Sequence, residues 1–222
     1  MNCLSNKSTI PKDKFNHIKN KWGAYASWTM WQDVKPWEAP KAHMGDLSIF
    51  DDEDTLLDIV HTDIVFVALN AADRDVADRP FSMFHDTSPR ANDYKMRYAF
   101  KDTVLWGSYI TDLFHNLRET DSNKVSRHLA VNPDFLKTQL DRFKQELADI
   151  AEPGYPKPIL VALGGTVKGL LDIHLRPAGY NVLSIDHYSL TGTKTRSNNK
   201  EEYRFKALEL IDQINEIRSI SQ

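Results

Sequence analysis

Apolar residues gather in four short runs that predict buried strands. The clearest is 64–69, where six consecutive apolar residues, three of them β-branched, are followed by the polar Asn70. Such a run is long enough for a buried strand and short for a helix. Similar runs at 103–110, 158–163 and 180–186 predict three more strands.

Helices are predicted between these strands, at 11–22, 55–60, 93–101, 132–150, 167–175 and over the last part of the chain. The most distinct begins at Asn132-Pro133, a cap residue followed by proline at the first helical position. Its apolar stripe has the helical period, at Leu136, Leu140, Phe143, Leu147 and Ile150. The last helix is expected to bury Leu208, Ile211, Ile214 and Ile217. Alternating strands and helices predict an α/β fold, a three-layer sandwich around a central four-stranded parallel sheet.

The segment 73–86 follows neither period and predicts a long loop, which in a compact domain is usually functional. Phe81 and Phe84 lie in it, and each could form the flat wall of a pocket or anchor the loop to the core. The turn Gly164-Gly165-Thr166 could admit a phosphate to a helix start. Its spacing is neither a P-loop nor GxGxxG, which favours close strand-to-helix packing.

Composition limits the class of protein. With 222 residues and 41% hydrophobic content, 1–222 is expected to form one domain. A Trp-rich amino-terminal extension, 1–45, is expected to pack on this domain, although its aromatic residues could also stack on bases. No apolar run approaches the roughly 18 residues of a membrane span, and no secretory signal is recognisable. We therefore expect a cytoplasmic protein, with a monomer favoured.

Charge and cysteine content exclude some kinds of site. Cys3 is the only cysteine, which rules out disulfides within the chain and a cysteine-ligated cluster. The net charge of −3 argues against a surface built throughout for a polyanion. A local basic face remains open, as does a solvated helix start, for Lys194, Arg196, Lys200, Arg204 and Lys206.

Three polar residues are expected at the ends of parallel strands, Asn70, Asp112 and His187. Such ends meet at one edge of an open α/β sheet, where ligands bind. An amide can hold a water molecule, and a neutral imidazole can donate to a developing oxyanion. Singly, Asn70 and His187 are more often turn or cap residues. GxSxG, Walker and HExxH motifs are absent from the sequence.

The order of these pieces from about 63 to 192 resembles the uracil-DNA glycosylase superfamily. The strand end at 67–71 looks like the first motif of that family, and 109–113 looks like the strand that reads the base edge. The segment 79–81 is similar to the one whose Phe stacks on the flipped base, with Phe84 as a rival. The segment 187–190 resembles the second motif.

The resemblance implies a DNA glycosylase that hydrolyses the N-glycosidic bond of a flipped uracil or another damaged or modified base. Asn70 would position water and His187 would stabilise the departing base. Leu190 would fill the gap in the duplex, and Lys194 and Arg196 would contact DNA phosphates. The remaining substrate contacts would be Ala68, Leu69, Ala71, Phe81, Phe84, Asp112, Tyr188 and Ser189. DNA is the implied partner, and neither a metal nor an organic cofactor is needed.

Three positions depart from the family pattern. Ala71 and Tyr188 stand where proline is usual, so the clamps on the DNA strand are expected to differ. Asp112 stands where uracil-reading members carry Asn. An ionised carboxylate only accepts hydrogen bonds, which favours a base with amino or N–H donors, or a protonated Asp112. The single cysteine excludes the iron–sulfur branch.

Two other functions stay open. One is a non-catalytic module of the same fold that binds a nucleobase, a nucleic acid or a protein. The other is a hydrolase of nucleosides or similar small molecules. A positive band beside the pocket mouth would favour the DNA enzyme over the latter.

Overall fold

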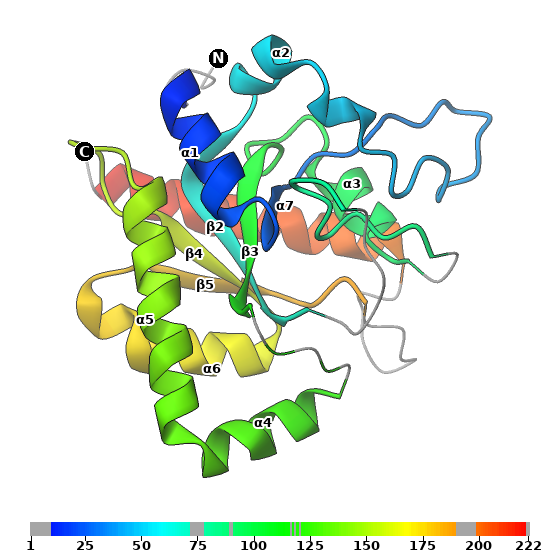
Figure 1. The fold of residues 1–222 in the computed structure, drawn as a ribbon. Helices are drawn as coiled ribbons and strands as arrows, with labels where there is room; N and C mark the ends of the chain where they lie inside the picture. The colour runs from blue at the N-terminus through cyan, green and yellow to red at the C-terminus, as the bar shows by residue number, and fades with distance from the viewer. Residues whose placement is uncertain are drawn as a thin grey trace.

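The computed structural model has helices on both faces of a five-stranded sheet (Figure 1). It describes residues 10–71, 78–88, 91–115, 117, 119, 121–189 and 199–220. The strands are β1 (Ala26–Trp28), β2 (His61–Asn70), β3 (Ser108–Phe114), β4 (Ile159–Leu163) and β5 (Val182–Ile185). Their order across the sheet is β1-β3-β2-β4-β5.

The α/β class is confirmed, whereas the four-stranded parallel sheet is wrong, because the sheet is mixed. β2, β3, β4 and β5 are parallel, and β1 pairs antiparallel with β3. β1 comes from the Trp-rich segment, and its three residues are all buried. With only three residues, it is too short for the alternating pattern by which a strand is usually recognised.

The strand predicted at 103–110 begins later than expected. Gly107 has φ +80°, and a Cβ there would lie 2.5 Å from the backbone oxygen of Ile59. Only glycine fits this turn, and β3 starts directly after it, at Ser108. Asp112 consequently lies inside the strand, paired with Ala68 of β2, rather than beyond its end.

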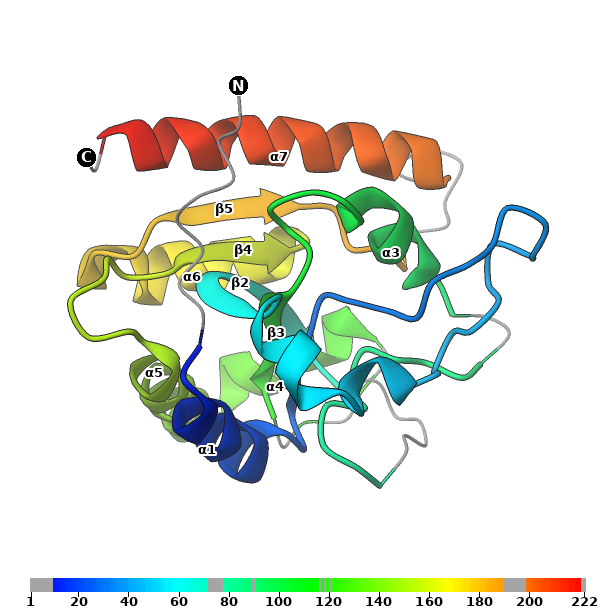
Figure 2. The same cartoon turned by 90° about the horizontal axis from the view of Figure 1, so that it is seen from above.

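The helices are α1 (Lys12–Trp22), α2 (Glu53–Leu57), α3 (Tyr94–Phe100), α4 (Ser122–Val131), α5 (Pro133–Ile150), α6 (Gly165–His174) and α7 (Lys200–Ile220), with short 3-10 turns at Ser48–Phe50 and Arg176–Ala178. α3 and α7 lie on one side of the sheet, and α1, α5 and α6 on the other (Figure 2). The sequence pattern did not predict α4. None of the helices among the described residues is both long and apolar enough to cross a membrane.

Two hydrophobic cores separate the sheet from its helix layers. Val65 and Val67 of β2 face the core that contains Phe143 of α5. Ile64 and Phe66 face the core shared with α3 and α7. Alternate residues of one strand thus serve both cores, which explains why its sequence is continuously apolar.

α7 buries a stripe that only partly matches the one predicted. Its buried residues are Tyr203, Ala207, Leu210 and Ile214, so Ile214 is confirmed, whereas Leu208 is 45% exposed. Ile211 and Ile217 are partly buried against the same core. The Tyr203 ring stacks on Phe100 of α3 with 6.3 Å between centroids. An aromatic and a small residue therefore set the rotation of α7, and the aliphatic spacing alone misplaced its buried face.

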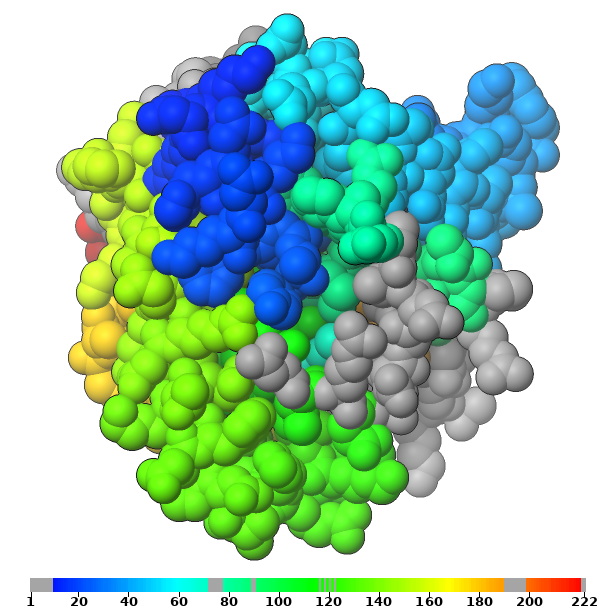
Figure 3. Space-filling model, viewed as in Figure 1, coloured from blue at the N-terminus to red at the C-terminus, as the bar shows by residue number. Residues whose placement is uncertain are grey.

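The tryptophans of the amino-terminal segment divide into two kinds. Trp22, Trp28 and Trp31 are at most 3% exposed, as the packing interpretation predicts. Trp37 is 78% exposed and lies in a segment that stands out from the body of the molecule (blue in Figure 3). The alternative of base stacking therefore remains for Trp37.

Candidate functional site

A cavity of about 480 Å³ lies at the carboxyl end of the parallel strands. It is bounded by the ends of β2, β4 and β5, by Asp112 of β3, and by residues of the segments 83–86 and 91–92. Small-molecule sites in proteins are usually roughly 300–1,000 Å³. We call this cavity the strand-end pocket.

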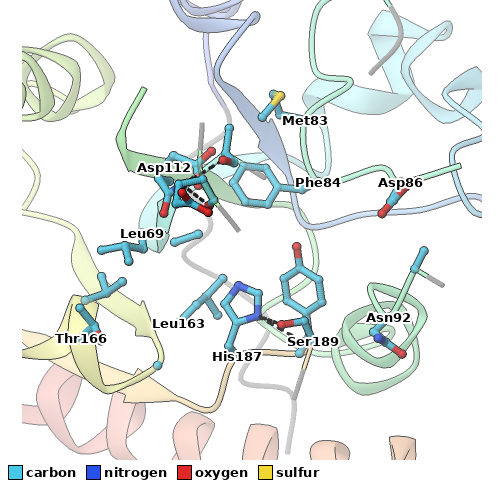
Figure 4. Close-up of a pocket in the computed structure, with 18 of the residues that line it drawn as sticks. Leu69, Met83, Phe84, Asp86, Asn92, Asp112, Leu163, Thr166, His187 and Ser189 are labelled. Carbon is cyan, nitrogen blue, oxygen red and sulfur yellow. Dashed lines mark hydrogen bonds between the residues drawn. The ribbon is translucent and has the colours of Figure 1, made fainter. Parts of the chain in front are cut away.

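The strand-end pocket brings together most of the site residues predicted from the sequence. Asn70, Asp112 and His187 all line it, as do Ala68, Leu69, Ala71, Phe84, Tyr188 and Ser189. Figure 4 shows Phe84 and Asp112 across the hollow from His187. Leu190, Lys194 and Arg196 lie outside the described residues.

The Asn70 amide is fixed in one orientation. Its Nδ2 donates to the carbonyl oxygens of Ala71 at 2.9 Å, Leu117 at 3.2 Å and Glu119 at 2.7 Å. Because carbonyl oxygens only accept hydrogen bonds, the amide atom that faces them is the nitrogen and not the oxygen. The half-buried side chain therefore ties the segment after β3 to the end of β2, and Oδ1 is the end that can accept a hydrogen bond.

The His187 ring has a defined protonation pattern. Its Nδ1 accepts from the backbone N–H of Ser189 at 3.2 Å and lies 2.7 Å from the Ser189 hydroxyl. A backbone N–H can only donate, so Nδ1 carries no proton while this bond holds. The neutral ring then carries its proton on Nε2, as a hydrogen-bond donor. The ring stacks on Tyr188 with 4.5 Å between centroids, which fixes its plane.

Phe81 and Phe84 occupy different places, which corrects the assignment of Phe81 to the pocket wall. Phe81 lies in the core on the α1 side, with its ring centroid 5.5 Å from Phe15 and 6.0 Å from Trp28. Phe84 belongs to the other core and lines the strand-end pocket. Both have positive φ, +66° and +69°, in a tightly turned loop that the residue pattern could not resolve.

The polar lining of the pocket is acidic. It contains the carboxylates of Asp86, Asp112 and Glu119, and no Lys or Arg occurs among its described lining residues. Asp112 is 3% exposed. Glu119 has a nearby cation, Lys124, with 3.6 Å between Oε2 and Nζ. This lining favours ligand atoms that donate hydrogen bonds.

The sequence did not single out several lining residues. Asp86 and Asn92 flank a stretch with no secondary-structure period, and Glu119 follows the end of β3. Asp86 could have been proposed as a pocket residue from its position at the end of the long predicted loop. Asn92 and Glu119 carried none, because only the fold brings them to this edge.

The glycine turn before α6 also lines the pocket. Gly164 has φ +95°, which favours glycine, and its N–H donates to Ile185 O at 2.9 Å. A Cβ on Gly165 would meet nothing within 4 Å. Close packing therefore does not explain Gly165, which corrects that interpretation of the turn.

Other clusters with catalytic residue types are closed to substrate. His61 contacts Asp63 through Nδ1, and its Nε2 lies 3.4 Å from the Ser108 hydroxyl. The three side chains are thus linked in the sequence Asp, His, Ser, as in a hydrolase triad. Ser108 is 0% and His61 1% exposed, so neither can reach a substrate. Among the described residues, no group of three or more His, Cys, Asp or Glu could hold a metal ion.

A second closed cluster lies between β3 and α5. The Tyr109 hydroxyl donates to Glu146 at 2.8 Å, and His115 Nε2 lies 3.0 Å from the other oxygen of Glu146. Burial raises the pKa of Tyr109 well above its ordinary value, and the Glu146 charge adds to the rise. The tyrosine therefore stays a donor, and the cluster has a structural role.

Comparison with protein-family models, with curated proteins and with solved structures finds no match to this chain.

Proposed function

We propose that this protein is a DNA glycosylase that hydrolyses the N-glycosidic bond of a base flipped into the strand-end pocket. One observation carries the proposal: the Asn70 amide, whose nitrogen donates to backbone carbonyls, and the His187 ring, whose Nδ1 accepts a backbone N–H, line the same cavity. Asn70 and His187 come from distant parts of the chain, and each is held by hydrogen bonds to backbone groups.

The two side chains suit the two groups on which charge develops during the reaction, the sugar and the base. As the glycosidic bond lengthens, positive charge develops on the sugar and negative charge on the base. The Nε2–H of His187 donates to the departing base. Oδ1 of Asn70 accepts from a water molecule directed at C1′. Flipping costs a few kcal/mol, and stacking of the base on Phe84 offsets part of it.

The acidic lining limits which bases the strand-end pocket can bind. Asp112 is an acceptor when ionised, and Asp86 and Glu119 add acceptors at the pocket edge. A base that presents amino or ring N–H groups pairs with these oxygens, whereas a carbonyl edge meets repulsion unless Asp112 is protonated. We therefore favour an amino-bearing modified base over uracil.

The test is release of bases from oligonucleotides that carry uracil, hypoxanthine, xanthine or alkylated bases, scored as strand cleavage at the abasic site. Asn70→Ala and His187→Ala are each expected to lower the rate at least about 100-fold, as is typical when a positioned catalytic group or oxyanion donor is removed. Asn20→Ala on α1 and His174→Ala on α6 are the matched controls, with unchanged rates expected.

Circular dichroism and thermal unfolding establish that each variant is folded. Retention of the full rate in folded Asn70→Ala or His187→Ala excludes the proposed mechanism.

A non-catalytic base-binding module is the second candidate. The residues that favour it are Ala71 and Tyr188, which replace the prolines expected beside the two proposed catalytic groups. It predicts that the wild-type protein binds an oligonucleotide and releases no base in the same assay.

A further inference from the structure

A second hollow of about 490 Å³ is lined by residues of α3 and shares no lining residue with the strand-end pocket. It is lined by the segment 33–40, by α3 and by the first turns of α7. We call it the α3–α7 groove and use six of its residues below: Lys35, Tyr94, Arg97, Tyr98, Lys200 and Arg204.

The α3–α7 groove is basic, in a chain with a net charge of −3. Among its described lining residues, five basic side chains face three acidic ones, which leaves a net charge of +2. One pair, Lys101 with Asp33, is internally neutral. Arg97 donates to the carbonyl oxygens of Gln32, Pro40 and Ala42, which hold it without neutralising its charge.

Two cations converge at the start of α7. Lys200 Nζ and the Arg204 guanidinium lie 4.6 Å and 5.7 Å from the centroid of the Tyr98 ring. Arg204 also donates to the carbonyl oxygen of Tyr98 at 2.9 Å. Lys200 has an exposed neighbouring carboxylate, Glu201, at 3.7 Å. Exposed ion pairs of this kind are weak, and the hydrogen bond of Arg204 to a carbonyl oxygen leaves its charge in place, so both cations can be recruited by a ligand phosphate.

Exposed aromatic rings accompany these cations. Tyr98 is 38% exposed and Trp37 is 78% exposed. Lys35, which lines the groove, has its Nζ 5.6 Å from the ring of Trp37. Trp37 does not line the groove itself but stands in the chain between the lining residues Pro36 and Glu38. A basic groove with accessible aromatic faces is the arrangement that binds single-stranded nucleic acid, because phosphates meet the cations and bases stack on the rings. The chain buries three neighbouring tryptophans but leaves this one in solvent.

The groove and the strand-end pocket are adjacent. Asn92, which lines the pocket, is two residues before the start of α3, and Tyr94 and Tyr98 of α3 line the groove. α3 lies beside the first turns of α7 in both views of the ribbon (Figures 1 and 2), and residues of both helices line the groove. The charges of the groove and the pocket are opposite, so phosphates are attracted to the groove and disfavoured in the pocket.

We propose that the α3–α7 groove binds the phosphodiester backbone of a single nucleic-acid strand, one base of which occupies the strand-end pocket. This proposal rests on the proposed function for the placement of the base. It identifies the substrate as a polymer rather than a free nucleoside, and it makes Lys200, Arg204 and Trp37 the residues that hold the strand.

The test is the fluorescence anisotropy of a labelled single-stranded 12-mer, titrated at several salt concentrations. The double variant Lys200→Gln/Arg204→Gln is expected to bind about tenfold more weakly at low salt. Its slope of log affinity against log salt should be shallower by about 1.4, since each phosphate contact to a single strand contributes roughly 0.7. Trp37→Ala is expected to lose at least about fivefold in affinity through stacking.

The matched control is Lys137→Gln/Lys144→Gln on α5, which removes the same charge elsewhere and should leave the affinity near the wild-type value. Arg204→Lys keeps the cation and should retain most of the binding. Circular dichroism confirms the fold of each variant.

The outcomes separate this proposal from the proposed function. A loss of binding confined to the groove variants supports nucleic-acid binding by the α3–α7 groove, even if the wild-type protein releases no base. Equal binding by the groove and control variants, no binding by the wild-type protein, or tighter binding of the matching duplex overturns it. Full cleavage of oligonucleotides by folded groove variants also overturns it, although the glycosylase proposal then stands.

Discussion

Phe81 and Phe84 are three residues apart in one loop and serve different cores. The Phe81 ring contacts Phe15, Trp28 and Phe50, all on the α1 side of the sheet. Phe84 is 4% exposed and presents its remaining surface to the strand-end pocket. At the scale of single residues, the structure thus separates a stabilising aromatic residue from one available to a ligand.

Substitution should separate these two roles. Phe81→Ala is expected to destabilise the fold by about 3–5 kcal/mol, the usual range for a buried aromatic residue. Phe84→Leu keeps most of the apolar volume and is expected to cost less than about 1.5 kcal/mol, while base release falls about tenfold because the flat face is lost. Urea unfolding and the abasic-site assay measure the two effects. Normal base release by Phe84→Leu would remove the stacking role.

At the scale of elements, α1 is attached to α5 through one carboxylate. Asp149 of α5 accepts from Trp22 Nε1 at 2.9 Å and from Gln145 at 3.0 Å, and it pairs with Lys21 at 2.6 Å. His17 is also within 3.8 Å. Burial raises the pKa of Asp149, but the hydrogen bonds from Lys21, Gln145 and Trp22 together outweigh it and lower the pKa below its ordinary value.

This attachment should depend on pH. Because the folded pKa of Asp149 lies below its unfolded value of about 3.9, the stabilisation is complete above that value and is lost as the pH falls through the folded pKa. Asp149→Asn is therefore expected to destabilise the protein by about 1 kcal/mol at pH 7 and by progressively less as the pH falls below about 3.9. Urea unfolding at pH 7 and at a series of lower pH values measures the change. An effect that stays constant across the series would contradict the role of the charge.

At the scale of the whole molecule, the amino-terminal segment is part of the fold rather than an addition to it. β1 covers the edge of β3, and α1 supplies Phe15, Ile18 and Trp22 to a core built mainly by later elements. Trp28 of β1 is 0% exposed. The mixed sheet is therefore complete only when β1 pairs with β3.

Removal of residues 1–31 should abolish cooperative folding. The shortened chain loses several large apolar side chains and exposes a strand edge, while typical domains are stable by only about 5–15 kcal/mol. We expect no sharp thermal transition in near-ultraviolet circular dichroism. A cooperative transition within about 5 °C of that of the full chain, judged against the roughly 2–4 °C that 1 kcal/mol shifts in a domain of this size, would show the segment to be dispensable.

The sequence predicted the principal polar residues of the candidate site but not several of the residues around them. Asn70 follows a continuous apolar run and His187 a shorter, interrupted one, and parallel strands deliver such residues to one edge. Asn92 and Glu119 are brought to the pocket by loops whose course depends on contacts far along the chain. The α3–α7 groove joins three segments that no local pattern relates.

The sequence by itself determined the elements with a strong local period: β2, β4 and β5 from their apolar runs, and α5 from its cap and stripe. Local patterns suffice there because backbone hydrogen bonding and side-chain burial repeat within a few residues. Tertiary structure alone decided the antiparallel entry of β1, the rotation of α7 and the separation of Phe81 from Phe84. Each of these depends on which distant side chains compete for the same buried space, a quantity that a window of neighbouring residues does not contain.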